Sequence, residues 1–318
     1  METYFKLLVA TDYSEEVRNA ERYALQFATR TQASVTLLHV ADPPPEMRLL
    51  VREQYPDMTW QNELEELRMH ALQLTSSLQL PERDLTYDCV VREGQVGEEV
   101  CEEAEKQGAN FIITGMHGPG GGLRDIFPGS HTWEVISHAT CPVLVIPPDG
   151  YFTGIKQITY VTEYRPGEMS AIAFLARLAE CFGAGLLILH LGNRSLPKEM
   201  ERQLFAEFRE SVYEKLNSRK ADIRLLQGEN PVAAINQFCF QSETDWLALS
   251  PGKSTLLSLL FGQGGNLTRQ MSFYSRIPML AIPDNFSAMD NRLWKALEQV
   301  GEEKQIGGQA RAGFGSFY

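Results

Sequence analysis

The chain has 318 residues, which exceeds one ordinary domain and suits two domains of about 150 residues each. Its formal net charge is −12 and no basic cluster is visible, so direct nucleic-acid binding, which needs concentrated Lys and Arg, is disfavoured. The 5 cysteines are scattered without a CxxC pair, which argues against a disulfide framework or a zinc site and indicates a reducing compartment.

No segment indicates secretion or membrane insertion. The opening METYFKLLVATD reaches an acidic residue at Asp12 instead of continuing as a charged-then-apolar signal. The longest apolar runs, such as Gly185–Leu191, are far shorter than the roughly 20 residues that span a bilayer. We therefore expect a cytoplasmic protein that contacts neither membrane nor nucleic acid.

The first half alternates short apolar strands with helical stretches. Strand Lys6–Ala10 leads to Asp12 and Ser14, and Ser14 is a candidate N-cap for a helix. The inward face of that helix is expected to carry Val17, Ala20, Ala24, Phe27 and Ala28. Further strands are expected at Val35–Val40, Leu85–Val91, Asn110–Thr114 and Val143–Ile146, with helices near Gln61–Ser77, across Gly97–Lys106 and from Ser130 to His138.

This alternation predicts an α/β fold with a doubly wound parallel sheet of the Rossmann-like kind, whose ligand crevice lies at the carboxyl ends of the strands. The helix near Gln61–Ser77 places Leu64, Leu67, Ala71 and Leu74 on one face. We interpret it as a solvated amphipathic helix without a chemical role.

The second half repeats the first. Phe5–Asp42 shifted by 151 residues lies on Lys156–Asn193 without a gap, and Thr11, Tyr13 and His39 then meet Thr162, Tyr164 and His190. Later segments match at an offset near 135 residues, so the second repeat is shortened where the first has Pro43–Pro81.

The repeat predicts two tandem domains, residues 1–149 and residues 150–285, followed by a helix and flexible tail over residues 286–318. The last strands of the two repeats, Val143–Ile146 and Met279–Ile282, are too apolar to stay as bare sheet edges. We expect them to pair antiparallel within the chain, as a pseudo-dimer; a homodimer and further protein partners stay open.

A glycine-rich loop follows the strand Asn110–Thr114. Gly115 and Gly118 can turn backbone N–H groups toward one anion, and Gly129-Ser130 at the next helix start adds free N–H donors and the helix dipole. A polyphosphate cradle and a simple connecting loop are both compatible with this composition.

The segments ATDYS, GMHG, GS and HATCPVLVIP resemble the universal stress protein family, whose nucleotide-binding members carry G-x2-G-x9-G-[S/T]. The resemblance covers about Phe5–Pro147 and, more weakly, Ile155–Pro283. It implies an adenine nucleotide such as ATP, with or without Mg2+, that meets Asp12 through its ribose and the backbone of Val40 through its adenine. The implied binding set is Ala10, Asp12, Val40, Thr114, Gly115, His117, Gly118, Gly129, Ser130, His131 and Thr132.

The loop departs from the family pattern by one residue. Ten residues, instead of nine, separate Gly118 from Gly129. The extra residue either bulges out at little cost, which keeps the cradle, or changes the pitch that aims the N–H donors.

The second repeat is eroded at the corresponding positions. Glu163 stands for Asp12, Ser250 and Lys253 stand for Gly115 and Gly118, and Asn266 stands for Ser130. Side chains are therefore expected to crowd the space of the phosphates, and we interpret this repeat as a scaffold.

Three other signals are weak. The run before Ser254-Thr255 looks like a P-loop, but position 247 is leucine where a Walker motif needs glycine. His117, His131 and His138 lack the Cys or carboxylate that would complete a metal site. Ser130 and His131 are neighbours turned about 100° apart on a helix, so a catalytic pair is disfavoured and no base can be named for a slow ATP hydrolysis.

The sequence thus predicts a stress-response sensor or regulator that binds an adenine nucleotide in its first domain. The alternative is an interaction scaffold of the same fold that binds no nucleotide.

Overall fold

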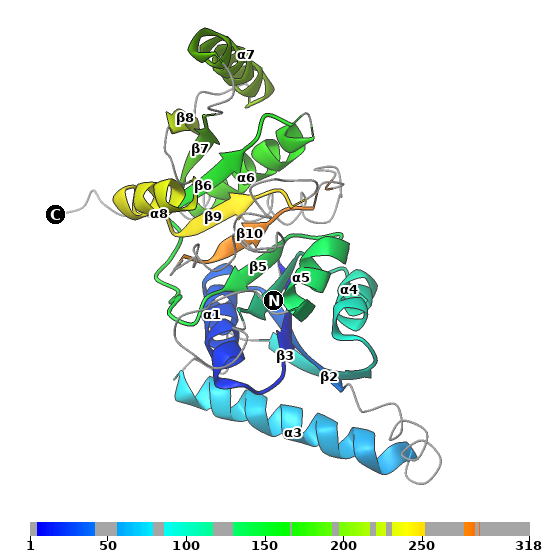
Figure 1. The fold of residues 1–318 in the computed structure, drawn as a ribbon. Coiled ribbons are helices and arrows are strands. Elements are labelled where there is room, and N and C mark those ends of the chain that lie inside the picture. The colour runs from blue at the N-terminus through cyan, green and yellow to red at the C-terminus, as the bar shows by residue number, and fades with distance from the viewer. Residues whose placement is uncertain are drawn as a thin grey trace, which may run out of the picture.

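A computed structural model of the chain shows two α/β repeats that share one sheet (Figure 1). The structure describes residues 5–41, 56–78, 86–116, 130–165, 167–192, 197–216, 221–226, 231–251, 277–283 and 286. The elements of the first repeat are β1 (Lys6–Thr11), α1 (Glu15–Thr31), β2 (Ser34–Ala41), α3 (Pro56–Ser77), β3 (Thr86–Glu93), α4 (Val96–Gln107), β4 (Phe111–Gly115), α5 (Ser130–His138) and β5 (Val143–Ile146). Those of the second are β6 (Gln157–Thr162), α6 (Glu168–Phe182), β7 (Gly185–Leu191), α7 (Lys198–Leu216), β8 (Ala221–Leu226), α8 (Pro231–Gln241), β9 (Trp246–Leu249) and β10 (Met279–Ala281).

The described strands form one sheet in the order β3-β2-β1-β4-β5-β10-β9-β6-β7-β8. Within each repeat all pairings between the described strands are parallel, which confirms the predicted fold class. The register repeats as well: Lys6 lies opposite Ser34, and Gln157, which is 151 residues further, lies opposite Gly185.

The two final strands join the repeats. β5 and β10 pair antiparallel at the centre of the sheet, with Leu144 opposite Leu280 (Figure 1). The prediction of an intrachain pairing is therefore confirmed. Because both strands have neighbours on both sides, neither apolar strand is left as an edge.

Aromatic side chains fill the junction between the repeats. Phe27 of α1 contacts Trp246 of β9 with ring centroids 5.6 Å apart, and it contacts Phe182 of α6 at 5.8 Å. The indole Nε1 of Trp246 donates a hydrogen bond of 2.6 Å to the hydroxyl of Tyr23, so the buried N–H is satisfied. The first repeat thus packs on the second through α1 as well as through the strand pair.

The first helix shows how local sequence sets these elements. The Ser14 side chain accepts a hydrogen bond from the backbone N–H of Val17, as expected of an N-cap. The predicted inward face of α1 is buried at all five positions, Val17, Ala20, Ala24, Phe27 and Ala28. The cap and the apolar face therefore agree on where α1 starts and which side meets the sheet.

Several predictions fall outside the described residues. These are most of the glycine-rich loop, the segment with the P-loop resemblance beyond Pro251, and the tail helix. Within the described ranges, every helix is too short or too polar to traverse a bilayer.

Candidate functional site

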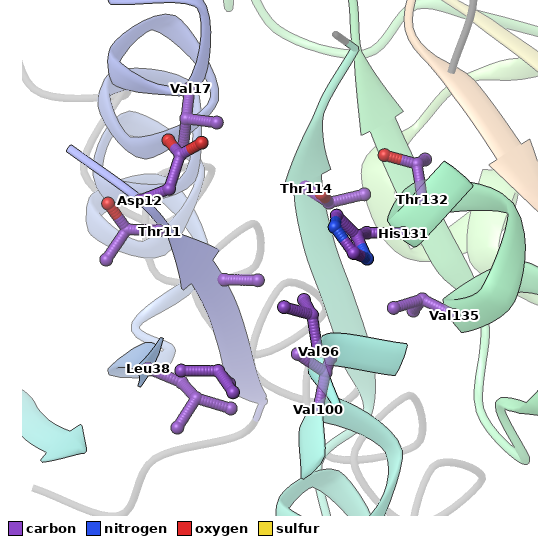
Figure 2. A pocket seen from close by; sticks show the side chains of 12 residues that line it. Thr11, Asp12, Val17, Leu38, Val96, Val100, Thr114, His131, Thr132 and Val135 are labelled. Atoms are coloured by element: carbon purple, nitrogen blue, oxygen red, sulfur yellow. The ribbon is translucent and has the colours of Figure 1, made fainter. Parts of the chain in front are cut away.

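A pocket of about 170 Å³ opens between the carboxyl ends of β1 and β4 (Figure 2). The chain leaves β1 toward β2 and leaves β4 toward β5, so the strand order reverses between them and their helices lie on opposite faces of the sheet. Such a reversal is where doubly wound sheets bind ligands. The pocket is lined by Ala10, Thr11, Asp12, Val17, Leu38, Val40, Val96, Val100, Thr114, His131, Thr132 and Val135.

The lining separates into an apolar part and a polar rim. Leu38 and Val40 come from β2, and Val96 and Val100 come from the first turns of α4. Asp12 and Thr11 face Thr114 and His131 across the opening (Figure 2). An apolar slot with a few polar groups at its rim suits a flat, largely apolar ring that carries a polar substituent.

The turn after β1 holds Asp12 at this rim. Tyr13 has a positive φ of 65°, and its backbone N–H donates to the hydroxyl of Thr11 at 3.1 Å. The carboxylate of Asp12 accepts a hydrogen bond of 3.0 Å from the backbone N–H of Ser14 and is itself exposed to solvent. The turn therefore presents a carboxylate at a fixed place beside the pocket.

Three helices begin at the pocket. Val17 lies in the first turn of α1, Val96 starts α4, and Thr132 lies in the first turn of α5. The first N–H groups of a helix have no partner within it and carry partial positive charge. Their convergence on one pocket favours a negatively charged ligand.

The walls formed by α4 and α5 are packed closely. A Cβ atom on Gly97 would lie 2.5 Å from the Cβ of Glu134, so only glycine lets the two helices approach this far. The buried hydroxyl of Thr132 donates to the carbonyl of Gly115 at 3.3 Å, which ties α5 to the end of β4. The α5 side of the pocket is thus fixed to the sheet.

The structure brings together part of the predicted binding set. Ala10, Asp12, Val40, Thr114, His131 and Thr132 line the pocket. Gly115 lies at the end of β4 beside it, and Ser130 begins α5, although its side chain lies outside the described part. His117, Gly118 and Gly129 lie outside the described residues.

Sequence reasoning missed half of the lining. The additional residues are Thr11, Val17, Leu38, Val96, Val100 and Val135. The expected apolar face of the first helix included Val17, but an apolar periodicity does not distinguish a side chain in the core from one that lines a pocket.

A family model for universal stress proteins matches residues 3–147. A universal stress protein of Methanocaldococcus jannaschii is 30% identical over 143 residues, which make up 45% of this chain and 82% of that protein. The universal stress protein YxiE of Bacillus subtilis is 26% identical over 147 residues, or 44% of this chain and 97% of that protein. The chain belongs to the universal stress protein family.

Solved structures extend the likeness to both repeats of this universal stress protein. A universal stress protein from Archaeoglobus fulgidus covers 90% of this chain and 100% of its own, with a TM-score of 0.63 and 14% identity. A putative universal stress protein from Pseudomonas aeruginosa covers 93% of this chain with a TM-score of 0.55. At such low identity these matches establish the fold of the tandem chain.

The second repeat of this universal stress protein has a different arrangement at the equivalent place. Arg165 follows β6, and its Nη2 donates a hydrogen bond of 2.8 Å to the carbonyl of Ser250, which follows β9. Since β6 and β9 correspond to β1 and β4, the arginine spans the second crevice. Arg165, which was not among the residues expected to crowd this crevice, therefore lies across it, whereas the expected Lys253 and Asn266 lie outside the described residues.

A buried carboxylate holds the arginine in place. Glu168 is 2% exposed and accepts hydrogen bonds from the Thr162 hydroxyl at 2.6 Å and from the backbone N–H of Arg165 at 3.1 Å. Its Oε1 also lies 3.4 Å from Nε of Arg165. The start of α6 is thus occupied by the chain's own carboxylate.

Proposed function

We propose that the first repeat binds an adenine nucleotide, ATP or a relative, in the pocket between β1 and β4. The protein then serves as a nucleotide-dependent sensor or regulator in a stress response. The observation that carries the proposal is the meeting of an apolar slot, the Asp12 carboxylate and three helix starts at the reversal of the strand order.

The chemistry of a nucleotide matches the parts of the pocket. The flat base suits the slot between Val40 and Val96, and Asp12 can accept hydrogen bonds from ribose hydroxyls. The phosphates suit the N-termini of α1, α4 and α5, because the N-terminus of a helix attracts an anion even without a lysine or arginine side chain. A Mg2+ ion would accompany the phosphates and reduce their charge.

For the second repeat we propose a scaffold role. Arg165 and Glu168 form an ion pair, and Arg165 also lies across the crevice between β6 and β9. This arrangement supports a repeat that contributes strands and packing but binds no nucleotide of its own. The expected stoichiometry is one nucleotide per chain.

The test is to denature the purified full chain and identify released small molecules by mass spectrometry, followed by calorimetric titration with ATP, ADP and AMP. Nucleotide-free chain is prepared by refolding and serves as the starting material for titration. One site per chain supports the proposal; no detectable binding of any of the three would overturn it in favour of a scaffold that binds no nucleotide.

A further inference from the structure

Two histidine–glutamate pairs fasten α3 to the rest of the first repeat. Nε2 of His70 on α3 lies 2.8 Å from both carboxylate oxygens of Glu21 on α1. Nε2 of His39 on β2 lies 3.9 Å from a carboxylate oxygen of Glu63 on α3. In one pair the helix supplies the histidine and in the other it supplies the carboxylate.

The first of these pairs is buried. The side chain of Glu21 is 0% exposed and that of His70 is 11% exposed. A carboxylate in such a place is costly unless a cationic or hydrogen-bonding partner compensates it. A proton on His70 makes the pair a charge-assisted hydrogen bond, and its loss leaves the buried carboxylate with a neutral partner.

Tyr13 connects this pair to the pocket. Its ring meets His70 edge-on, with centroids 5.2 Å apart, and lies against His39 at 4.6 Å. Nδ1 of His39 is 2.9 Å from the carbonyl of Thr11, and Tyr13 itself occupies the turn between Asp12 and Ser14. The packing of α3 against Tyr13 therefore supports the turn that holds Asp12.

Further titratable groups surround Tyr13. Burial, followed by nearby acidic groups, raises the pKa of its phenol, so Tyr13 stays neutral over the physiological range. Burial also raises the pKa of the Cys89 thiol on β3, against the influence of Arg68. The groups that act on Tyr13 or Cys89 from the packed elements are Glu21 of α1, Glu63, Glu66 and Arg68 of α3, and Asp88 of β3.

The second repeat keeps the tyrosine and lacks the buried pair. Tyr164 stacks on His190 at 3.5 Å, and Nδ1 of His190 is 3.1 Å from the Thr162 carbonyl, as in the first repeat. The partner of Tyr164 on α7 is Phe208, at 4.5 Å, and the position that corresponds to Glu21 is Ile172, which is buried. The titratable pair of the first repeat thus corresponds to apolar residues in the second, where the buried Glu201 of α7 also acts on Tyr164.

We propose that α3 is a proton-controlled clamp on the first repeat, closed when His70 is protonated opposite Glu21 and loosened when that proton is lost. Imidazole is the side chain whose charge ordinarily changes between about pH 5 and 8, so the clamp is examined over that range. Acidification tightens α3 against α1 and steadies the Tyr13 turn. A consequence for ligand affinity rests on the proposed nucleotide site.

The clamp is tested on the nucleotide-free full chain by hydrogen exchange, with rates corrected for the intrinsic effect of pH. We expect the protection of amides around Leu67–Leu74 to fall about fivefold to tenfold from about pH 6 to about pH 8. The protection of α7 should change much less. A flat profile for α3 would overturn the clamp.

The second repeat provides the design of the test variant. Glu21→Ile combined with His70→Phe copies Ile172 and Phe208, and such apolar replacement of a buried pair is often tolerated. The double variant should keep α3 docked and lose its pH response, whereas His138→Gln, on an exposed part of α5, should retain it. The single variant Glu21→Gln, which keeps His70, should also lose the response. A pH response of wild-type size in the folded double variant or in Glu21→Gln would overturn the clamp.

The ligand consequence is measured separately, as the ATP affinity of the wild type and of the double variant at the two pH values. His131 is common to both proteins, so a pH dependence seen only in the wild type belongs to the clamp. If no nucleotide binds at either pH, the proposed function fails, whereas the exchange experiment still decides the clamp.

Discussion

The two crevices of this chain begin with the same turn and hold different contents. In each, a threonine hydroxyl accepts from the backbone N–H of a tyrosine in the left-handed region, at 3.1 Å in both Thr11–Tyr13 and Thr162–Tyr164. The first crevice then leaves a pocket beside Asp12, whereas the second is spanned by Arg165. One turn therefore supports either an open site or a closed one, and the next few side chains decide which.

Charge distinguishes the two crevices. At the start of α6 the chain provides its own carboxylate, Glu168, which Arg165 balances. In α1 the equivalent region carries Ser14, a neutral cap, and the acidic Asp12 stays at the exposed rim. In the first repeat the start of α1 is thus capped by a neutral hydroxyl, and the Gln95 side chain makes no capping hydrogen bond at α4.

Disrupting the strand pair that joins the two repeats should have the largest effect on stability. Leu280→Pro removes a backbone N–H from β10. Because β10 pairs with β5 on one side and β9 on the other, this N–H faces a paired strand whichever way it points. We expect a loss of about 3 kcal/mol or more in the free energy of unfolding and increased self-association. Calorimetric unfolding and sedimentation measure both effects.

Leu280→Val is the control for this change, because it keeps the N–H and most of the apolar volume. If the proline variant unfolds at the wild-type temperature as a monomer, the strand pair does not hold the repeats together.

Opening the second crevice should have the next largest effect. Glu168→Gln turns a carboxylate that accepts from two backbone N–H groups and a hydroxyl into an amide that can accept only through one oxygen. We expect the free energy of unfolding to fall by about 2–3 kcal/mol. Denaturant titration of this variant is compared with that of Glu199→Gln, whose side chain is 90% exposed. If the two variants have equal free energies of unfolding, the buried hydrogen bonds of Glu168 do not stabilise the second repeat more than an exposed carboxylate does.

The comparison of the repeats also shows what the sequence can and cannot predict. The bounds of α5 and β5 were predicted correctly, because Gly129-Ser130 marks a helix start and Val143–Ile146 is an apolar run after a proline. The helix α3 begins at Pro56, five residues before the predicted start at Gln61, because proline is favoured in the first turn of a helix and extends it toward the N-terminus.

Contacts between distant residues could not be predicted in this way. The helix interpreted as having no chemical role carries His70, whose partner Glu21 is 49 residues away, and no periodicity relates the two. Arg165 and Ser250 are 85 residues apart, so the closed crevice was predicted only as crowding. Val96 and Val100 line the pocket because α4 packs closely against α5 at Gly97, and this contact between two helices cannot be seen in the sequence.

A matched pair of rim variants separates the two crevices by affinity. Asp12→Ala removes the carboxylate beside the open pocket and should weaken adenine nucleotide binding at least tenfold, or about 1.4 kcal/mol. Glu163→Ala, at the corresponding position of the closed crevice, should leave the affinity unchanged. Calorimetry on both variants gives the affinity and the stoichiometry together. Two nucleotides per chain, or equal losses in both variants, would contradict the assignment of the site to the first repeat.

The smallest expected effect is a pH dependence in the second repeat that opposes the clamp in the first. Burial lowers the pKa of His190, although the Thr162 carbonyl and Glu201 act in the other direction. A histidine whose folded pKa is lowered binds its proton more readily when unfolded, so its stability contribution is present above the unfolded value of about 6.5 and is lost as the pH falls through it. We expect exchange protection in β6 and β7 to decrease on acidification to about pH 5, and His190→Asn, whose amide can replace Nδ1 as a donor to Thr162, to reduce that decrease. His138→Asn on α5 should leave it as in the wild type. If His190→Asn retains the full acid sensitivity, or if α3 and β7 lose protection at the same end of the pH range, the two repeats do not respond to protons in opposite senses.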